Sequence, residues 1–482
     1  MIRDVFVLGA GRGLQALAGL ATIRVATDML APETMGYVVQ TASLVALLAS
    51  IVVVPVGVYV GRGFLGWLDS GIARRLLLRF LAFAATAAVA SALLVLIVRS
   101  SVSIIEGVSA ASLAALTLIY VFGFPLQTAG TACLNLLGRR ITYVAFGNLA
   151  VWGGLAFAVG LFHYFPSPEG WLFGLYLGYV AAAFAFLLVM RLAGKSAGDA
   201  TGSLPFTVRA VFRFAWPQVL ITVLWWTQSQ SYRFVLGEVG GPALVGLFAA
   251  GYTVCAGTMQ AFETLFHELY NPKLYRSLAD QGQAGVTQTW NDYASAYLPA
   301  VVLFGAFLVG MSPFLAKVLL AEQYREMIPV LFLPAVAETL RAMGSALHTM
   351  GVAKLDMRVL VVPVLVGAIL SPVLVYVLGS IDPLLGTALG MFLTYLAVFL
   401  VVIPISRRAL PVRWPVGRML AAALAGLPMI ILGQFPPLTF DGTLAMSLLV
   451  LAIGVVYLGG AQFVLARPWL GQLGVRFDKR TK

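Results

Sequence analysis

The chain has 482 residues, of which 61% are hydrophobic and only 10% are Asp, Glu, Lys or Arg, and its formal net charge is +12. Soluble domains carry about 25% charged residues because their surfaces face water, so this composition excludes a set of folded soluble domains. It predicts an all-α, polytopic membrane protein. The two cysteines, Cys133 and Cys255, each lie in an apolar run, which excludes a disulfide framework and a cysteine-rich metal site.

About fourteen apolar segments are long enough to cross a bilayer as helices. In chain order they cover residues 5–27, 36–60, 76–98, 110–133, 143–162, 171–193, 212–235, 243–265, 297–320, 327–350, 358–378, 384–406, 414–433 and 444–466. The first segment follows a short charged start and has no clear cleavage site, so it is predicted to stay as a span rather than be removed as a signal peptide.

Basic residues are concentrated in the loops on one side of this map. With an even number of spans, 23 Lys and Arg fall on the side that holds both termini, and two, Arg99 and Arg325, on the other. Short loops rich in Lys and Arg stay in the cytoplasm, so a multi-pass protein of the bacterial inner membrane with both termini cytoplasmic is predicted. The basic loops would face anionic lipid headgroups. A nucleic-acid partner is not expected, because it would need a basic folded domain.

A weak internal repeat divides the chain. Three features of the first copy recur at an offset of 209 or 210 residues: Arg24 as Arg233, the turn proline Pro32 as Pro242, and the span-opening Gly36 as Gly246. Six spans per copy would insert both copies in the same orientation, which is a common transporter plan. The predicted lobes are residues 1–200 and 205–410, followed in 411–482 by two additional helices and a basic cytoplasmic tail.

Several stretches of this repeat resemble a known family. They are Leu30-Ala31-Pro32-Glu33-Thr34-Met35-Gly36-Tyr37 after a first span with internal Arg, Tyr232 to Gly237, Val245 to Tyr252, Gly351 to Lys354, and Gly386 to Gly390. Together they are similar to the Wzx-type lipid-linked oligosaccharide flippases, a branch of the multidrug/oligosaccharidyl-lipid/polysaccharide exporter superfamily that includes MurJ.

The resemblance implies a V-shaped pair of six-helix lobes that opens alternately to either side, with two extra C-terminal helices. It implies a transporter rather than an enzyme, without a cofactor. The implied cargo is an undecaprenyl-pyrophosphate-linked sugar repeat unit, moved from the cytoplasmic to the periplasmic leaflet for cell-surface polysaccharide assembly. Other polysaccharide assembly proteins are further candidate partners.

A diphosphate that crosses lipid needs fixed positive charge, and the planar, always-charged fork of Arg suits it. The candidates for a cationic central cavity are the intramembrane residues Arg12, Arg24, Arg233 and Arg341. A charge in mid-span costs at least ~2.5 kcal/mol and is usually functional or paired. The alternative is pairing, because Arg24 lies four residues before Asp28 and Arg341 three residues after Glu338.

Two acidic side chains, Glu263 and Glu338, lie well inside spans. Either is a candidate for binding a proton or sodium ion that couples transport to a gradient, with the membrane potential as another driving force; the alternative is that each pairs with an intramembrane Arg. Gln15, Gln228 and Gln230 are candidates for a polar lining or, equally, for joining helices.

Two other functions compete with a flippase. A membrane polysaccharide polymerase or lipid-dependent glycosyltransferase would display paired carboxylates on sizeable periplasmic loops, whereas the loops here are short and their acids dispersed. A multidrug exporter of the same superfamily would carry cations, which intramembrane Arg would repel.

Overall fold

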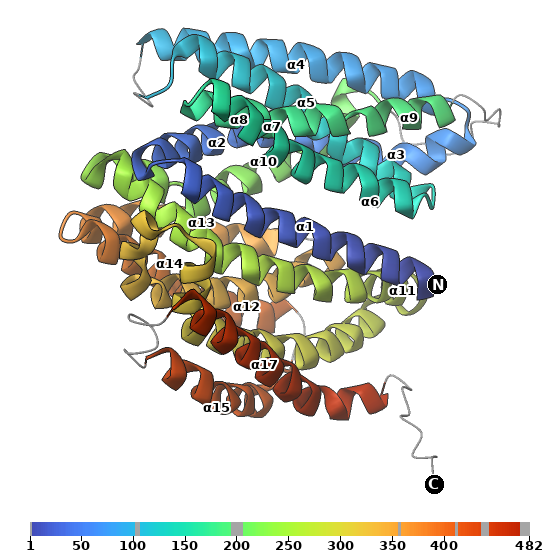
Figure 1. Ribbon diagram of the computed structural model, residues 1–482. Coiled ribbons are helices and arrows are strands. Elements are labelled where there is room, and N and C mark those ends of the chain that lie inside the picture. The colour runs from blue at the N-terminus through green and yellow to red at the C-terminus, as the bar shows by residue number, and fades with distance from the viewer. Residues whose placement is uncertain are drawn as a thin grey trace. The chain divides into compact units, whose positions relative to one another are not determined.

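The computed structural model describes residues 2–101, 107–193, 206–354, 358–409, 413–434 and 443–472, and every regular element in them is helical. The elements are α1 (Ile2–Met29), α2 (Pro32–Val52), α3 (Val54–Asp69), α4 (Ala73–Ser101), α5 (Ala110–Leu136), α6 (Arg140–Asn148), the π-helical turn η1 (Leu149–Gly153), α7 (Gly154–Tyr164), α8 (Pro168–Ala182), α9 (Phe184–Ala193), α10 (Val208–Gln230), α11 (Tyr232–Leu319), the 3-10 helix η2 (Glu322–Val330), α12 (Phe332–Lys354), α13 (Arg358–Gly379), α14 (Pro383–Ala409), α15 (Val416–Gly433) and α17 (Leu444–Gln472) (Figure 1).

Within the described ranges, eleven helices are long and apolar enough to cross a membrane, or twelve if η2 and the following helix form one bent span. The predicted all-α, multi-pass membrane fold is therefore confirmed. All fourteen predicted segments fall on helical stretches.

One of the eleven candidate spans is too long for a single crossing. It runs over Val208–Thr264, 57 residues, which would extend about 85 Å as a straight helix against a hydrocarbon core of about 30 Å. Gly241, with φ of 80°, interrupts it, because a left-handed residue cannot continue a right-handed helix. The predicted spans 212–235 and 243–265 meet at this turn.

Local sequence explains where several helices begin. Ser167 caps α8 by accepting a hydrogen bond from the Gly170 amide at 3.1 Å, and Pro168 occupies the first helical turn. A serine or threonine at the cap and a proline just inside are the residues that a helix start favours. Pro55 breaks a helix rather than starting one. It has no amide hydrogen to donate to Ile51, and the helix is interrupted at Val53, between α2 and α3.

Packing divides the chain into two compact units. Unit 1 comprises Met1–Thr22, Leu30–Gly237 and Gly241–Gly246, and unit 2 comprises Ile23–Met29, Glu238–Gly240 and Leu247–Lys482. The division by packing assigns α10 and the first turns of α11 to unit 1. The predicted lobes 1–200 and 205–410 and the segment 411–482 stay predictions.

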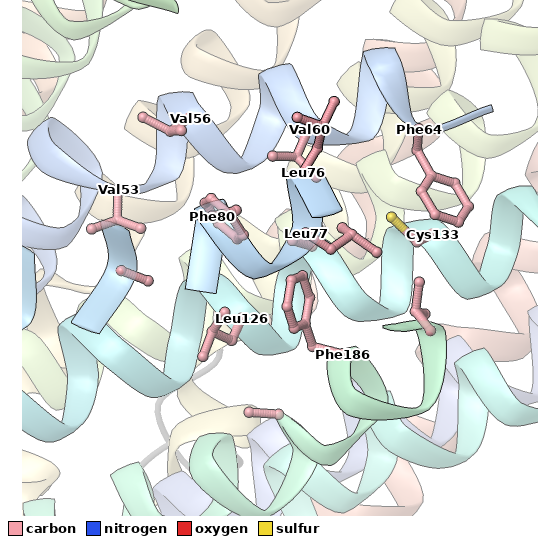
Figure 2. Close-up of a cluster of buried hydrophobic side chains, with 14 of the residues drawn as sticks. Val53, Val56, Val60, Phe64, Leu76, Leu77, Phe80, Leu126, Cys133 and Phe186 are labelled. Atoms are coloured by element: carbon pink, nitrogen blue, oxygen red, sulfur yellow. The ribbon is translucent and has the colours of Figure 1, made fainter. Parts of the chain in front are cut away.

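The core of unit 1 is an apolar cluster where α3, α4, α5 and α9 meet (Figure 2). Figure 2 shows Phe80 of α4 beside Phe186 of α9, whose ring centroids are 5.7 Å apart. Leu126 and Cys133 of α5 complete the cluster, and Cys133 is fully buried, as an inert thiol inside an apolar run should be.

In unit 2, α12 and α13 both pack against α14, and α15 and α17 pack on each other. The Tyr457 hydroxyl of α17 donates to the Ala425 carbonyl of α15 at 2.7 Å, and the Gln462 amide donates to the Ala300 carbonyl of α11 at 3.0 Å. Only 11% of the α17 span is buried, the smallest share among the candidate spans. An apolar helix with so little burial is suited to face lipid.

Candidate functional site

The most concentrated buried charge in the described part of the chain is a triad in unit 2, formed by Glu263, Glu338 and Arg341. Arg341 donates through Nε to Glu338 Oε2 at 2.6 Å and through Nη2 to Glu263 Oε2. Glu338 is 1% exposed and Glu263 4% exposed. Three of the residues predicted from the sequence therefore meet at one place, and each carboxylate pairs with the same guanidinium. We call these three residues the buried triad.

Hydroxyl groups form hydrogen bonds with the carboxylate oxygens that are turned away from Arg341. Tyr252 donates to Glu338 Oε1, and Ser345 donates to Glu263 Oε1 at 2.6 Å. The Tyr297 hydroxyl lies 3.0 Å from both Glu263 Oε1 and the Ala342 carbonyl oxygen. All four carboxylate oxygens thus have a donor within hydrogen-bond distance, which is what buried charges require.

The buried triad has an unbalanced formal charge. Two carboxylates and one guanidinium sum to −1 when all three are ionised. A further basic group, His267, lies just beyond the span, and burial lowers its pKa, an effect that Glu263 opposes and Arg341 reinforces. The imidazole is therefore neutral near pH 7 and does not cancel the excess negative charge.

A second polar group joins α2 to α10 and α11 in unit 1. Its centre is Arg233, whose Nη1 donates to Ser43 Oγ and, at 3.3 Å, to the Val39 carbonyl. Nε donates to the Tyr232 hydroxyl at 3.2 Å, and the guanidinium lies over that ring. The Gln40 amide donates to the Arg233 carbonyl at 2.9 Å. We call Arg233, Ser43, Gln40 and Gln230 the Arg233 cluster.

The predicted polar residues Gln228 and Gln230 both lie on α10. Gln228 is buried. Gln230 Oε1 lies 3.5 Å from Ser43 Oγ, and its amide donates to Ser229 at 3.4 Å, so Gln230 belongs to the Arg233 cluster. Among the residues that the structure describes, the side-chain partners of Arg233 are neutral oxygens rather than carboxylates.

The third predicted cation, Arg12 on α1, also contacts neutral groups in unit 1. Its Nη1 donates to Gln15 at 2.9 Å and its Nη2 to the Tyr143 hydroxyl at 2.6 Å. The same guanidinium lies over the Tyr143 ring, 5.6 Å from the centroid. Gln15, predicted as a polar lining residue, therefore orients Arg12 toward α6.

Arg24, the fourth predicted cation, forms a surface ion pair. Its Nη2 lies 3.0 Å from Asp28, one helical turn away, and the two side chains are 41% and 46% exposed. Arg24 and Arg233 occupy matching positions in the repeat, yet only Arg24 has a carboxylate one turn later; the corresponding position of the second copy is Gly237.

The sequence did not single out Tyr252, Tyr297, Ser345, Ser43 or Tyr143. Each contacts a predicted charge from a distant part of the chain, 82 residues or more away in every pair but that of Tyr297 with Glu263. Neutral hydroxyls on apolar helices are common, so no signal in the sequence marks these five. Only the packing shows which hydroxyls face a charge.

No family model matches this sequence, and no curated protein matches it. Solved structures do. The lipid II flippase MurJ in an inward closed conformation matches with a TM-score of 0.69 and 12% identity, over 98% of this chain and 100% of that chain. A mutant of the Vibrio cholerae MATE transporter VcmN matches at 0.58 and 11% identity, over 84% and 96%.

The chain has the fold of MurJ and the MATE transporters. A third match widens the set: a Pyrococcus furiosus transporter of the MOP superfamily, described as having a binding pocket of reversed polarity, matches with a TM-score of 0.56 and 14% identity over 89% of this chain and 95% of that one. Identities this low establish the fold alone.

Proposed function

We propose that this chain is a flippase of the bacterial inner membrane. It moves an undecaprenyl-pyrophosphate-linked oligosaccharide repeat unit from the cytoplasmic to the periplasmic leaflet, by alternating access, for cell-surface polysaccharide assembly. The fold shared with MurJ and with MATE transporters supports a transporter that handles a molecule from within the membrane.

The environment of Arg233 is the main support for an anionic cargo. A guanidinium inside a span is costly unless it is paired or has a function. In the described part of the chain, the hydrogen-bond acceptors of Arg233 are neutral oxygens. Hydroxyl and carbonyl oxygens orient the guanidinium without cancelling its charge. An incoming diphosphate would supply the missing anion through bidentate hydrogen bonds.

Charge is distributed unequally between the two units, and this supports the same function. Among the residues that the structure describes, the buried carboxylates are Glu263 and Glu338, both in unit 2. Unit 1 instead holds Arg12 and Arg233. In unit 1 a cationic cargo would meet Arg12 and Arg233, and like charges repel most strongly in a low-dielectric site.

The experiment that tests the cargo is flipping in proteoliposomes. The purified chain is reconstituted with a fluorescent undecaprenyl-pyrophosphate-linked oligosaccharide, and an impermeant reagent that modifies the sugar counts the molecules in each leaflet. Protein-dependent exchange that a cationic drug does not inhibit supports the proposal. Hydrolysis or polymerisation of the glycan by the chain would support the enzyme alternative, and transport of the drug would support the exporter.

The buried triad is the site that we assign to energy coupling in this flippase. Its excess negative charge is unfavourable in the membrane interior, and one bound proton neutralises it. A sodium ion needs several oxygen ligands at once, whereas a proton needs a single carboxylate oxygen. All four of these oxygens already have a donor, so a proton is favoured. The titratable groups that face the triad are Tyr252, Cys255 and His267 of α11, Tyr297 of α11, and Tyr395 of α14.

We expect Glu338→Gln to uncouple flipping from the proton gradient. The amide fixes the triad in its neutral, proton-loaded charge state, so the protein should stay folded and flip cargo passively but lose its acceleration by a proton gradient. Rates in proteoliposomes with an imposed proton gradient or sodium gradient measure this. Glu33→Gln, at an exposed position, is the control and should keep the response. A full proton response in Glu338→Gln would refute the assignment.

The cytoplasmic position of both termini has its own test. The asymmetry of loop charge predicts that reporter fusions at Thr34, Ser167 and Pro383 lie outside the cytoplasm, and that fusions at Ser70 and Gln281 lie inside it. Alkaline phosphatase and green fluorescent protein fusions distinguish the two sides. A clear reversal at any one of these positions would contradict the predicted topology.

A further inference from the structure

Gly36 and Gly246 occupy corresponding positions in the repeat. Inside unit 1, each of them contacts the backbone of the segment that contains the other. Pro32 begins α2 and Gly36 follows one turn later; Pro242 and Gly246 repeat this spacing in α11, next to the turn at Gly241. A Cβ atom on Gly36 would clash with the Pro242 carbonyl oxygen, and one on Gly246 would clash with the Pro32 carbonyl oxygen.

The contact is reciprocal and made by backbone alone. A Cβ on Gly246 would also lie 2.9 Å from the Gly36 nitrogen, so the start of α2 and the segment of α11 after Gly241 pack against each other with no side chain between them. Neighbouring side chains on the same helix starts are exposed, namely Glu33 and Ala243, and these two also correspond at an offset of 210 residues. Both positions are therefore accessible to a label next to this contact.

We propose that Gly36 and Gly246, each against the opposite proline, form a latch that closes the periplasmic end of the transport path and opens once in every cycle. The inference rests on the proposed alternating access. Both turns join odd-numbered spans to even-numbered ones, which the loop charges place on the periplasmic side. Contacts between small residues let backbones approach closely.

The latch is also linked to the cation of the proposed cargo site. One helical turn beyond Gly36 on α2, Gln40 holds the Arg233 carbonyl, and Ser43 holds its guanidinium. If the start of α2 moves away when the latch opens, these contacts loosen together. Arg233 then loses its orientation at the stage at which the cargo must leave.

The test measures a distance that needs no cargo. Nitroxide labels on Glu33→Cys and Ala243→Cys report proximity through dipolar broadening of the EPR spectrum in lipid nanodiscs, and the native Cys133 and Cys255 are fully buried and escape labelling. We expect strong broadening with the glycines intact. Gly36→Ala or Gly246→Ala should shift the closed-to-open ratio about tenfold toward open, which is about 1.4 kcal/mol of overpacking.

Gly257→Ala is the matched control, because a Cβ at Gly257, on the same helix as Gly246, meets nothing within 4 Å; it should keep the broadening. Unchanged broadening in both folded latch variants would overturn the proposal.

A second measurement covers the case in which the latch variants do not fold. Both glycines stay intact, and a short cleavable cross-linker joins the two thiols of the Glu33→Cys, Ala243→Cys double variant. The cross-link should stop flipping, and a reductant that cleaves the linker should restore it. Flipping that continues in the fully cross-linked protein would overturn the latch. If the chain flips no lipid-linked glycan at all, the proposed function fails, but the EPR comparison still decides whether the glycines hold this end closed.

Discussion

Arg341→Ala is expected to destabilise the protein more than the loss of Arg12, Arg24 or Arg233. It leaves the carboxylates of Glu263 and Glu338 buried without their common cation, and breaking a buried ion pair in this way costs about 3–5 kcal/mol. Thermal unfolding of the detergent-solubilised protein, followed by tryptophan fluorescence or by loss of the monodisperse gel-filtration peak, measures the effect.

Arg24→Ala is the matched control, since it removes the same side chain from an ion pair in the same unit. The Arg24–Asp28 pair is 41% and 46% exposed, and exposed pairs contribute about 0–1 kcal/mol. Its midpoint should stay close to that of the unmodified protein. If Arg341→Ala were as stable as Arg24→Ala, the triad would not be the buried, mutually dependent group that the structure shows.

A compensating variant separates charge from packing. Arg341→Met combined with Glu263→Gln and Glu338→Gln removes all three formal charges while keeping side chains of similar volume. Replacing a buried ionic group by neutral residues is often tolerated, so this triple variant should regain much of the stability lost in Arg341→Ala. It should remain unresponsive to a proton gradient, because no titratable carboxylate is left in the triad.

The behaviour of the charged residues shows what a sequence can reveal. The Arg24–Asp28 and Glu338–Arg341 pairs were predictable, because residues three or four apart share one face of a helix. Glu263 joins Arg341 across 78 residues of chain, and no local pattern connects them. The sequence marked all three members of the triad as costly in lipid, and only the fold shows that they neutralise one another in part.

The helices and the repeat show the same difference between local structure, which the sequence predicts, and contacts across the chain, which only the fold shows. Apolar periodicity predicted where the chain is helical, since burial in lipid demands it. The offset of 210 residues between Gly36 and Gly246 was also readable, but their meeting was not. A repeat records a shared local structure, whereas contact between its copies depends on the backbone path of helices far apart in the chain.

Export of the cargo should depend on the guanidinium of Arg233. We expect Arg233→Ala to accumulate in the membrane at normal levels, because the groups it leaves behind are neutral: Ser43, the Val39 carbonyl and the Tyr232 hydroxyl. Ser43 also bonds to its own helix at 2.6 Å. Export should nevertheless fall roughly ten- to a hundredfold, since a hydrogen bond to a charged group contributes about 1.5–3 kcal/mol.

Arg233→Lys should restore export only in part, because an ammonium supplies the charge without the two-pronged fit to phosphate oxygens. Arg213→Ala, which removes an exposed arginine from the neighbouring α10, is the control and should export normally. Complementation of a flippase-deficient strain, with the amount of protein in the membrane measured alongside, gives the comparison. Full export by Arg233→Ala at normal abundance would show that this guanidinium orients helices rather than cargo, and the assignment of an anionic, diphosphate-linked substrate would lose its main support.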